Sequence, residues 1–292
     1  TKDPGQSWMR WRALKTWRYH AATLLVLCLA AYWLFPTLTH FFKGIYQHPM
    51  QGMLWSVLLV NTPEWLDVLP LYVIFLLVAS FAFPLFVKAK TKTRVLLLWL
   101  PSFAIWIGAL FGLRDAVNSV FPDWICHGDF DPFAWQFVYF SGAAMAAWWK
   151  RAKSEESSGN ALAVTIVKRL TPAVGVILAF CFLWSHQFVQ IPLPSDFYVS
   201  KVHVGALRFV NFFAFVMGIG FIVRTWPSLL DFRFTNVMGR HSLDVYTVHI
   251  VFIYMWFATP ANIRYHAPWN VIVPVAACVL LWALAKFREP KA

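Results

Sequence analysis

The chain has 292 residues, of which 60% are hydrophobic and only 13% are charged, and its formal net charge is +12. This number of charged side chains is too small to cover the surface of a water-soluble globule of this length. The composition therefore excludes an ordinary soluble fold. We therefore predict an all-α protein, a polytopic bundle of transmembrane helices forming one membrane domain over residues 1–292.

A helix needs about 20 mostly apolar residues to cross the roughly 30 Å hydrocarbon layer of a bilayer. About eight runs in the sequence approach this length. They cover residues 20–35 (extended by 36–38), 66–87, 95–113, 132–149, 170–185, 204–223, 241–258 and 268–285. Residues 52–60 are apolar but too short to span, which predicts an interfacial or re-entrant segment.

The positive charges alternate from one connecting segment to the next. Twenty of the 25 Lys and Arg residues lie on one side of the predicted spans, including the arm of residues 1–19, the loop of residues 150–169 and the C-terminal end. Cytoplasmic loops hold an excess of Lys and Arg, so we predict that both termini are cytoplasmic. The net charge then indicates attraction to anionic membrane lipid, and we expect no nucleic acid partner.

The cysteines predict no disulfide, since three of the four lie in predicted spans. Cys126 lies in a loop with His127, Asp129 and Asp131, residue types that can bind metals. Their spacing matches no ligand pattern with a mechanism behind it. We interpret this segment as an acidic, solvated loop and predict no metal site.

Three polar residues near the outer ends of two predicted spans are candidate site residues. Arg208 lies about four residues inside its span, where a charge is costly unless it reaches water or a partner. Asn211 is three positions further and shares its helical face. Asp67 begins the second span at a similar depth, so Asp67 and Arg208 either pair with each other or are solvated separately.

The predicted seventh helix carries a polar face. Ser242, Tyr246 and His249 follow at spacings of four and three residues, which places them within an arc of roughly 60°. His249 is either an interhelical histidine with satisfied hydrogen bonds or a group that transfers protons or orients a substrate. Asp244 points about 140° away from His249, so we do not group the two.

The N-terminal arm alternates tryptophans with four basic residues, Arg10, Arg12, Lys15 and Arg18. Such a pattern is typical of an anchor at the lipid surface. The alternative is a cytoplasmic pocket for a phosphorylated donor, in which guanidinium groups bind phosphates in pairs of hydrogen bonds.

Three short stretches in this order and spacing resemble the OpgC family, within the wider acyltransferase-3 group. They are LDVLPLY at residues 66–72, DPFAWQ at residues 131–136 and GRHSL at residues 239–243. The stretch WRYH at residues 17–20, just before an apolar run, is similar to the entrance of that family's third helix. The resemblance covers essentially the whole chain.

The resemblance implies a membrane-bound O-acyltransferase of the bacterial inner membrane. It would move an acyl group, succinyl in this family, from cytoplasmic acyl-coenzyme A to a hydroxyl of a periplasmic glucan or other carbohydrate, with no bound cofactor. Ser242, Tyr246 and His249 would then line the catalytic site. The donor's phosphates would be bound by Arg10, Arg12, Lys15 and Arg18, and the acceptor entrance would be lined by Asp67, Arg208 and Asn211.

Family members open with two further helices, whose early membrane histidine is thought to act in acyl transfer. These helices are missing here, so we expect this sequence to begin inside a longer one. Two other interpretations stay open: a remnant of the fold without catalysis, and a secondary transporter of a small polar or anionic solute. Transporters commonly contain inverted repeats, and neither LDVLPLY nor GRHSL has a second copy in this chain.

Overall fold

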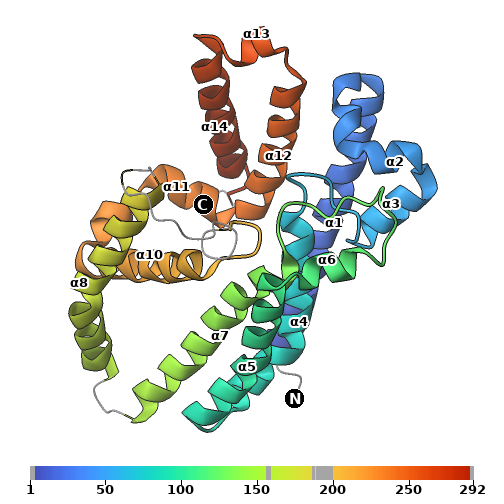
Figure 1. The fold of residues 1–292 in the computed structure, drawn as a ribbon. Helices are drawn as coiled ribbons and strands as arrows, with labels where there is room; N and C mark the ends of the chain where they lie inside the picture. Colours follow the sequence, from blue (N-terminus) through green and yellow to red (C-terminus); the bar gives the residue numbers. More distant parts are fainter. Residues whose placement is uncertain (1–3, 156–158, 186–187, 189–199, 290–292) are drawn as a thin grey trace. The chain divides into compact units, whose positions relative to one another are not determined.

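The computed structural model describes residues 4–155, 159–185, 188 and 200–289, and this part of the chain is helical without any strand (Figure 1). One isolated parallel bridge joins Thr62 and His127. The predicted all-α class is therefore confirmed. The contacts divide the chain into two compact units, described separately below. The first unit comprises Thr1–Gln6, Val78–Val120 and Phe130–Leu230, and the second comprises Ser7–Leu77, Phe121–Asp129 and Asp231–Ala292.

Within the described residues, four helices are long and apolar enough to cross a membrane. They are α4 (Val68–Lys88), α5 (Lys92–Leu110), α10 (Ala206–Thr225) and α14 (Trp269–Phe287). The helix α12 (Ser242–Ala258) and the segment Pro172–Trp184 of α8 (Gly159–Ser185) are apolar but shorter. Each of these helices coincides with a predicted apolar run, whereas the predicted total of about eight spans stays a prediction.

The basic arm is not a separate element, because it is continuous with the first apolar run in α1 (Pro4–Trp33). No glycine or proline lies between Gln6 and Trp33 to interrupt the helix. The helix ends shortly before Pro36, which disfavours helical geometry in the residue that precedes it. Three short helices follow: η1 (Pro36–Phe42), α2 (Lys43–Gln47) and α3 (Pro49–Val57).

The second unit is built around an apolar core between α1, η1 and α12. Leu24, Leu27 and Tyr254 are almost completely buried in this core, and Phe42 stacks on Tyr254 with ring centroids 5.2 Å apart. The helices α12 and α14 lie side by side and are joined through α13 (Ala261–Arg264), and α11 (Arg233–Arg240) packs on α14 (Figure 1). The core therefore fixes where α12 stands relative to α1.

The first unit is built around the pairs α5 with α7 (Pro132–Glu155) and α8 with α10 (Figure 1). Aromatic rings fill its core, with Phe137 stacked between Trp106 at 4.6 Å and Phe209 at 4.4 Å. Two short helices, α6 (Leu113–Asn118) and η2 (Pro227–Leu230), complete it. Much of the predicted loop of residues 150–169 is helical, since α7 runs to Glu155 and α8 starts at Gly159, while residues 156–158 lie outside the described residues.

Candidate functional site

Two segments of the second unit, residues 61–67 and 123–129, are joined by hydrogen bonds and are called the loop pair below. Asn61 is buried, donates from Nδ2 to Ser56 Oγ at 2.7 Å and accepts the backbone N–H of Cys126 at Oδ1 at 2.8 Å. The backbone N–H of Thr62 donates to the Cys126 carbonyl at 2.7 Å. These bonds satisfy polar groups that would be costly to leave unpaired away from water.

Asp67 lies inside the loop pair, where it is buried and accepts the backbone N–H of Asp129 at Oδ2 at 2.7 Å. The neighbouring Gly128 has a φ of +65°, and a Cβ there would come within 2.6 Å of Asp67 Cβ and 2.9 Å of Thr62 Oγ1. Only glycine fits this conformation and this space. Asp67, which the sequence predicts at the entrance for the acceptor substrate, therefore joins the two segments of the loop pair.

Two tyrosines of α12 hold the same backbone from the other side. Tyr246 donates its hydroxyl to the Trp65 carbonyl at 3.4 Å, a long hydrogen bond, and Tyr254 donates to the Glu64 carbonyl. Ser242, at the start of α12, and His249 are exposed in the structure. Of the three predicted catalytic residues, Tyr246 is thus the one that contacts the loop pair.

A cavity of about 440 Å³, the polar cavity below, lies beside the loop pair. It is lined by His40, Phe41, Phe42, Lys43, Gly44, Gln47, Asn61, Pro63, Glu64, Asp123, Trp124, Ile125 and Cys126. Carboxylate, amide and aromatic groups occur together at its wall. Burial raises the pKa of the Cys126 thiol, so this group stays a neutral thiol at physiological pH.

A second cavity of about 440 Å³, the arginine cavity below, opens between α1, α12 and α14. It is lined by Arg18, Tyr19, Ala22, Asp244, Thr247, Val248, Leu284 and Arg288. The Tyr19 hydroxyl donates to Asp244 Oδ1 at 2.5 Å, and Arg288 Nη2 is 4.0 Å from the same oxygen. This hydrogen bond is the main cause that raises the pKa of Tyr19, with burial second.

The four basic residues predicted to bind donor phosphates do not gather at one point. In a continuous helix Arg10, Arg12, Lys15 and Arg18 spread over about 200° of the circumference. The Arg12 guanidinium stacks over Trp8 at 4.9 Å, and Lys15 Nζ lies 5.6 Å from the Trp11 ring centroid. Arg18 is the member of this set that lines the arginine cavity, where Arg288 takes a place that the sequence analysis did not assign.

Two further residues of α1 have a structural role that the sequence analysis missed. The indole N–H of Trp17 donates to the Val57 carbonyl at 2.9 Å, and His20 Nε2 is 3.2 Å from the Ser56 carbonyl. The last carbonyls of a helix have no partner within that helix, so Trp17 and His20 satisfy the C-terminal end of α3. His20 is completely buried, and its contact requires the proton on Nε2.

The remaining predicted site residues, Arg208 and Asn211, lie on α10 in the first unit and are partly exposed. Asp67 belongs to the second unit. The pairing of Asp67 with Arg208 therefore stays a prediction.

The DPFAWQ stretch has a structural explanation within the first unit. Asp131 is completely buried, caps the start of α7 by accepting the Phe133 N–H at 2.9 Å, and lies 3.0 Å from His203 Nδ1. Gln136 accepts the Ser102 hydroxyl at 2.6 Å and donates to the Ser102 carbonyl at 2.8 Å, which joins α7 to α5. This stretch therefore builds a helix start and a helix contact.

The fold and its apolar helices define an integral membrane protein with two polar recesses on one helical unit. A family model described as OpgC protein matches residues 2–291, so the chain belongs to the OpgC family. The resemblance drawn from the three stretches is confirmed, and membership indicates an acyltransferase-like function in glucan modification. Comparisons with curated proteins and with solved structures give no match.

Proposed function

We propose that the protein is an O-acyltransferase of the bacterial inner membrane that moves a succinyl group from cytoplasmic succinyl-coenzyme A to a hydroxyl of a periplasmic glucan. The family match along residues 2–291 carries this proposal. The polypeptide would cross the membrane about eight times with both termini in the cytoplasm, since Lys and Arg accumulate on that side.

The arginine cavity is the proposed donor site. Arg18 and Arg288 bring two guanidinium groups to one recess, and guanidinium groups bind phosphates through paired, charge-assisted hydrogen bonds. In the same cavity, the hydrogen bond between Tyr19 and Asp244 holds α1 against α12. Arg10, Arg12 and Lys15 extend along α1 and would contact phosphates further out or anionic lipid.

The polar cavity is the proposed acceptor site. Sugar hydroxyls both donate and accept hydrogen bonds, so the carboxylates of Glu64 and Asp123 and the amide of Gln47 suit them. Trp124 provides an apolar face for a sugar ring. Asp67 would act here by holding the loop pair that forms the cavity wall. Arg208 and Asn211 of the first unit stay proposed acceptor-binding residues, without a position relative to this cavity.

The contacts beside the two cavities lie at different positions along α12. Tyr19 meets Asp244 at the arginine cavity, whereas Phe42 stacks on Tyr254 near the polar cavity. Tyr254 follows Asp244 by ten positions along α12, a rise of about 15 Å. His249 lies midway between them along this helix but about 140° around it from Asp244, and its assignment to the reaction is proposed from the family resemblance.

In the proposed reaction, His249 takes the proton of a sugar hydroxyl, whose oxygen attacks the thioester carbonyl carbon. The carbon–sulfur bond then breaks, and the coenzyme A thiolate takes up the proton from His249. The proposed donors that stabilise the negative charge on the thioester oxygen are the hydroxyl of Ser242 and that of Tyr246, which would exchange its long hydrogen bond to the Trp65 carbonyl for this contact. A water-poor site would suppress hydrolysis of the donor.

The test uses membranes that contain the full-length protein, labelled succinyl-coenzyme A and a glucan acceptor. Arg18→Gln combined with Arg288→Gln should raise the KM for the donor at least tenfold, because each charge-assisted hydrogen bond contributes about 1.5 kcal/mol or more. The control Arg233→Gln also removes a positive charge but lies outside both cavities. His249→Gln should lower kcat by about 100-fold or more with an unchanged KM.

Two results would contradict the proposal. One is an unchanged donor KM in the Arg18 and Arg288 double variant. The other is protein-dependent uptake of a labelled polar solute into vesicles without any acyl transfer, which would favour the transporter.

A further inference from the structure

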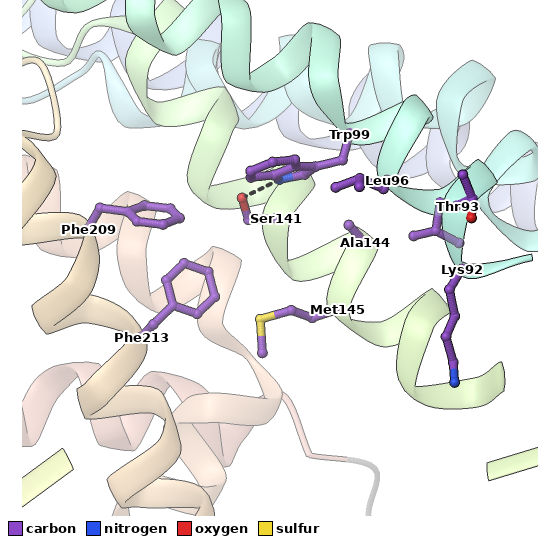
Figure 2. Close-up of a pocket in the computed structure, with 10 residues that line it drawn as sticks. Lys92, Thr93, Leu96, Trp99, Ser141, Ala144, Met145, Phe209 and Phe213 are labelled. Atoms are coloured by element: carbon purple, nitrogen blue, oxygen red, sulfur yellow. Dashed lines mark hydrogen bonds between the residues drawn. The ribbon is translucent and has the colours of Figure 1, made fainter. Parts of the chain in front are cut away.

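A groove of about 500 Å³ lies in the first unit between α5, α7 and α10, remote in sequence from the helices of both cavities described above. Figure 2 shows its lining, with Phe209 and Phe213 of α10 on one side and Leu96 and Trp99 of α5 on the other. The full lining is Lys92, Thr93, Val95, Leu96, Trp99, Ser141, Ala144, Met145, Phe209 and Phe213.

The interior of the groove is almost entirely apolar. Between Trp99 and Ser141, the indole N–H donates to the serine Oγ at 2.8 Å (Figure 2). The single donor of the Trp99 indole is therefore not available to a polar ligand. Both α5 and α10 are long and apolar enough to cross a membrane, so the groove opens beside hydrocarbon, which fills such a space better than water.

A lysine lies at one end of the groove. Lys92 is the first residue of α5 and lies at this end, seven residues or about 10 Å of helix away from Trp99 (Figure 2). Lys88, Lys90 and Arg94 are its neighbours in sequence, and no acidic residue lies between positions 88 and 94. A position at the end of an apolar helix is where the membrane interface lies, at the depth of lipid phosphates.

We propose that this groove binds one acyl chain of an anionic phospholipid, with the lipid phosphate at Lys92. The apolar walls receive the chain, and the cations at the start of α5 select the negative headgroup. The first backbone N–H groups of α5 point to the same end and favour a negative charge there. The proposal does not depend on acyl transfer, because it involves neither the arginine cavity nor the polar cavity.

The experiment uses the purified full-length protein in nanodiscs of phosphatidylcholine and two photoactivatable probes, phosphatidylglycerol and phosphatidylcholine with a diazirine in the same acyl chain. The phosphatidylglycerol probe should label peptides that contain Met145 or Phe213. Lys92→Gln should lower this labelling about fivefold, the factor that corresponds to about 1 kcal/mol for one interfacial charge, and leave phosphatidylcholine labelling unchanged. Arg224→Gln, an exposed charge at the end of α10, is the matched control and should change neither.

Ala144→Trp fills the groove and should abolish labelling of these peptides by both probes, whereas Ala104→Trp on the exposed face of α5 should not. Lys92→Gln changes only an exposed side chain, so it keeps the test valid if Ala144→Trp fails to fold. Equal labelling by the two probes, or labelling that survives in a folded Ala144→Trp variant, would overturn the proposal. Displacement of the probe by a long-chain acyl-coenzyme A but not by phosphatidylglycerol would also overturn it, because the occupant would then be a donor.

Discussion

The substitution Gly128→Ala tests whether the loop pair depends on the close approach of Gly128 and Asp67. Gly128 has a φ of +65°, and a left-handed backbone costs a residue with a Cβ about 1–2 kcal/mol. The new Cβ would also come within 2.6 Å of Asp67 Cβ and 2.8 Å of Asp67 Oδ2. The carboxyl group must then move away from the Asp129 N–H that it accepts at 2.7 Å.

Loss of that partly buried hydrogen bond, whose acceptor Asp67 is buried, adds roughly 1–3 kcal/mol. We therefore expect Gly128→Ala to lower the free energy of unfolding by about 2–5 kcal/mol. The chain offers a matched control at Gly112, which has a φ of +88° but nothing within 4 Å of an added Cβ. Gly112→Ala should therefore cost only the backbone term of about 1–2 kcal/mol.

The assay is unfolding in mixed micelles with increasing dodecyl sulfate, followed by tryptophan fluorescence for the wild type and both variants. The informative quantity is the difference between the two variants, because it removes the backbone term that they share. Equal losses in Gly128→Ala and Gly112→Ala would refute the reasoning, since the crowding at Asp67 would then contribute nothing.

Substitutions at three other positions have defined outcomes in the same assay. Asp131→Ala removes the cap of α7 and should lower the free energy of unfolding by about 1–2 kcal/mol, with Asp131→Asn closer to wild type. The hydrogen bond to Asp244 raises the pKa of Tyr19 above its ordinary 10.0, so this group stabilises the fold below pH 10 and the effect is lost as pH rises through the raised pKa. Tyr19→Phe should therefore reduce the fall in the free energy of unfolding between pH 9 and pH 11. An unchanged pH profile would contradict this. The hydrogen bond from Arg240 lowers the pKa of Glu289 below its ordinary 4.5, so the stabilisation by Glu289 is present above pH 4.5 and is lost as pH falls through the lowered pKa. Glu289→Gln should therefore reduce the fall in the free energy of unfolding in this acidic range.

The helices could largely be predicted from the sequence, because a helix depends on local hydrogen bonds and on the residues that interrupt it. The apolar runs at residues 66–87, 204–223 and 268–285 correspond closely to α4, α10 and α14. The limits of α1 and α8 were harder to predict, because a change from apolar to basic side chains does not end a helix. Without a glycine or proline at that point, the backbone bonds continue through the basic arm.

The candidate site was less accessible, because its defining bonds join residues that are far apart in the sequence. Asn61 and the Cys126 backbone are 65 positions apart, and Tyr19 and Asp244 are 225 positions apart. A periodic pattern in the sequence predicts which residues share a helical face, but it does not predict which distant residues form a hydrogen bond. The helical periodicity directs Asp244 away from His249, and in that direction it meets Tyr19 and Arg288.

The family stretches identify the fold more directly than they identify the reacting groups. Asp131 of DPFAWQ caps α7, Asp67 of LDVLPLY joins the loop pair, and Arg240 of GRHSL pairs with Glu289 at the end of α14. Each of these charged groups has a structural partner. Loss of activity on replacing them therefore does not establish catalysis, since a distorted cavity or helix start would give the same result. A catalytic assignment requires a fall in kcat at unchanged stability, and the partly exposed groups of α12 and the arginine cavity can be tested in that way.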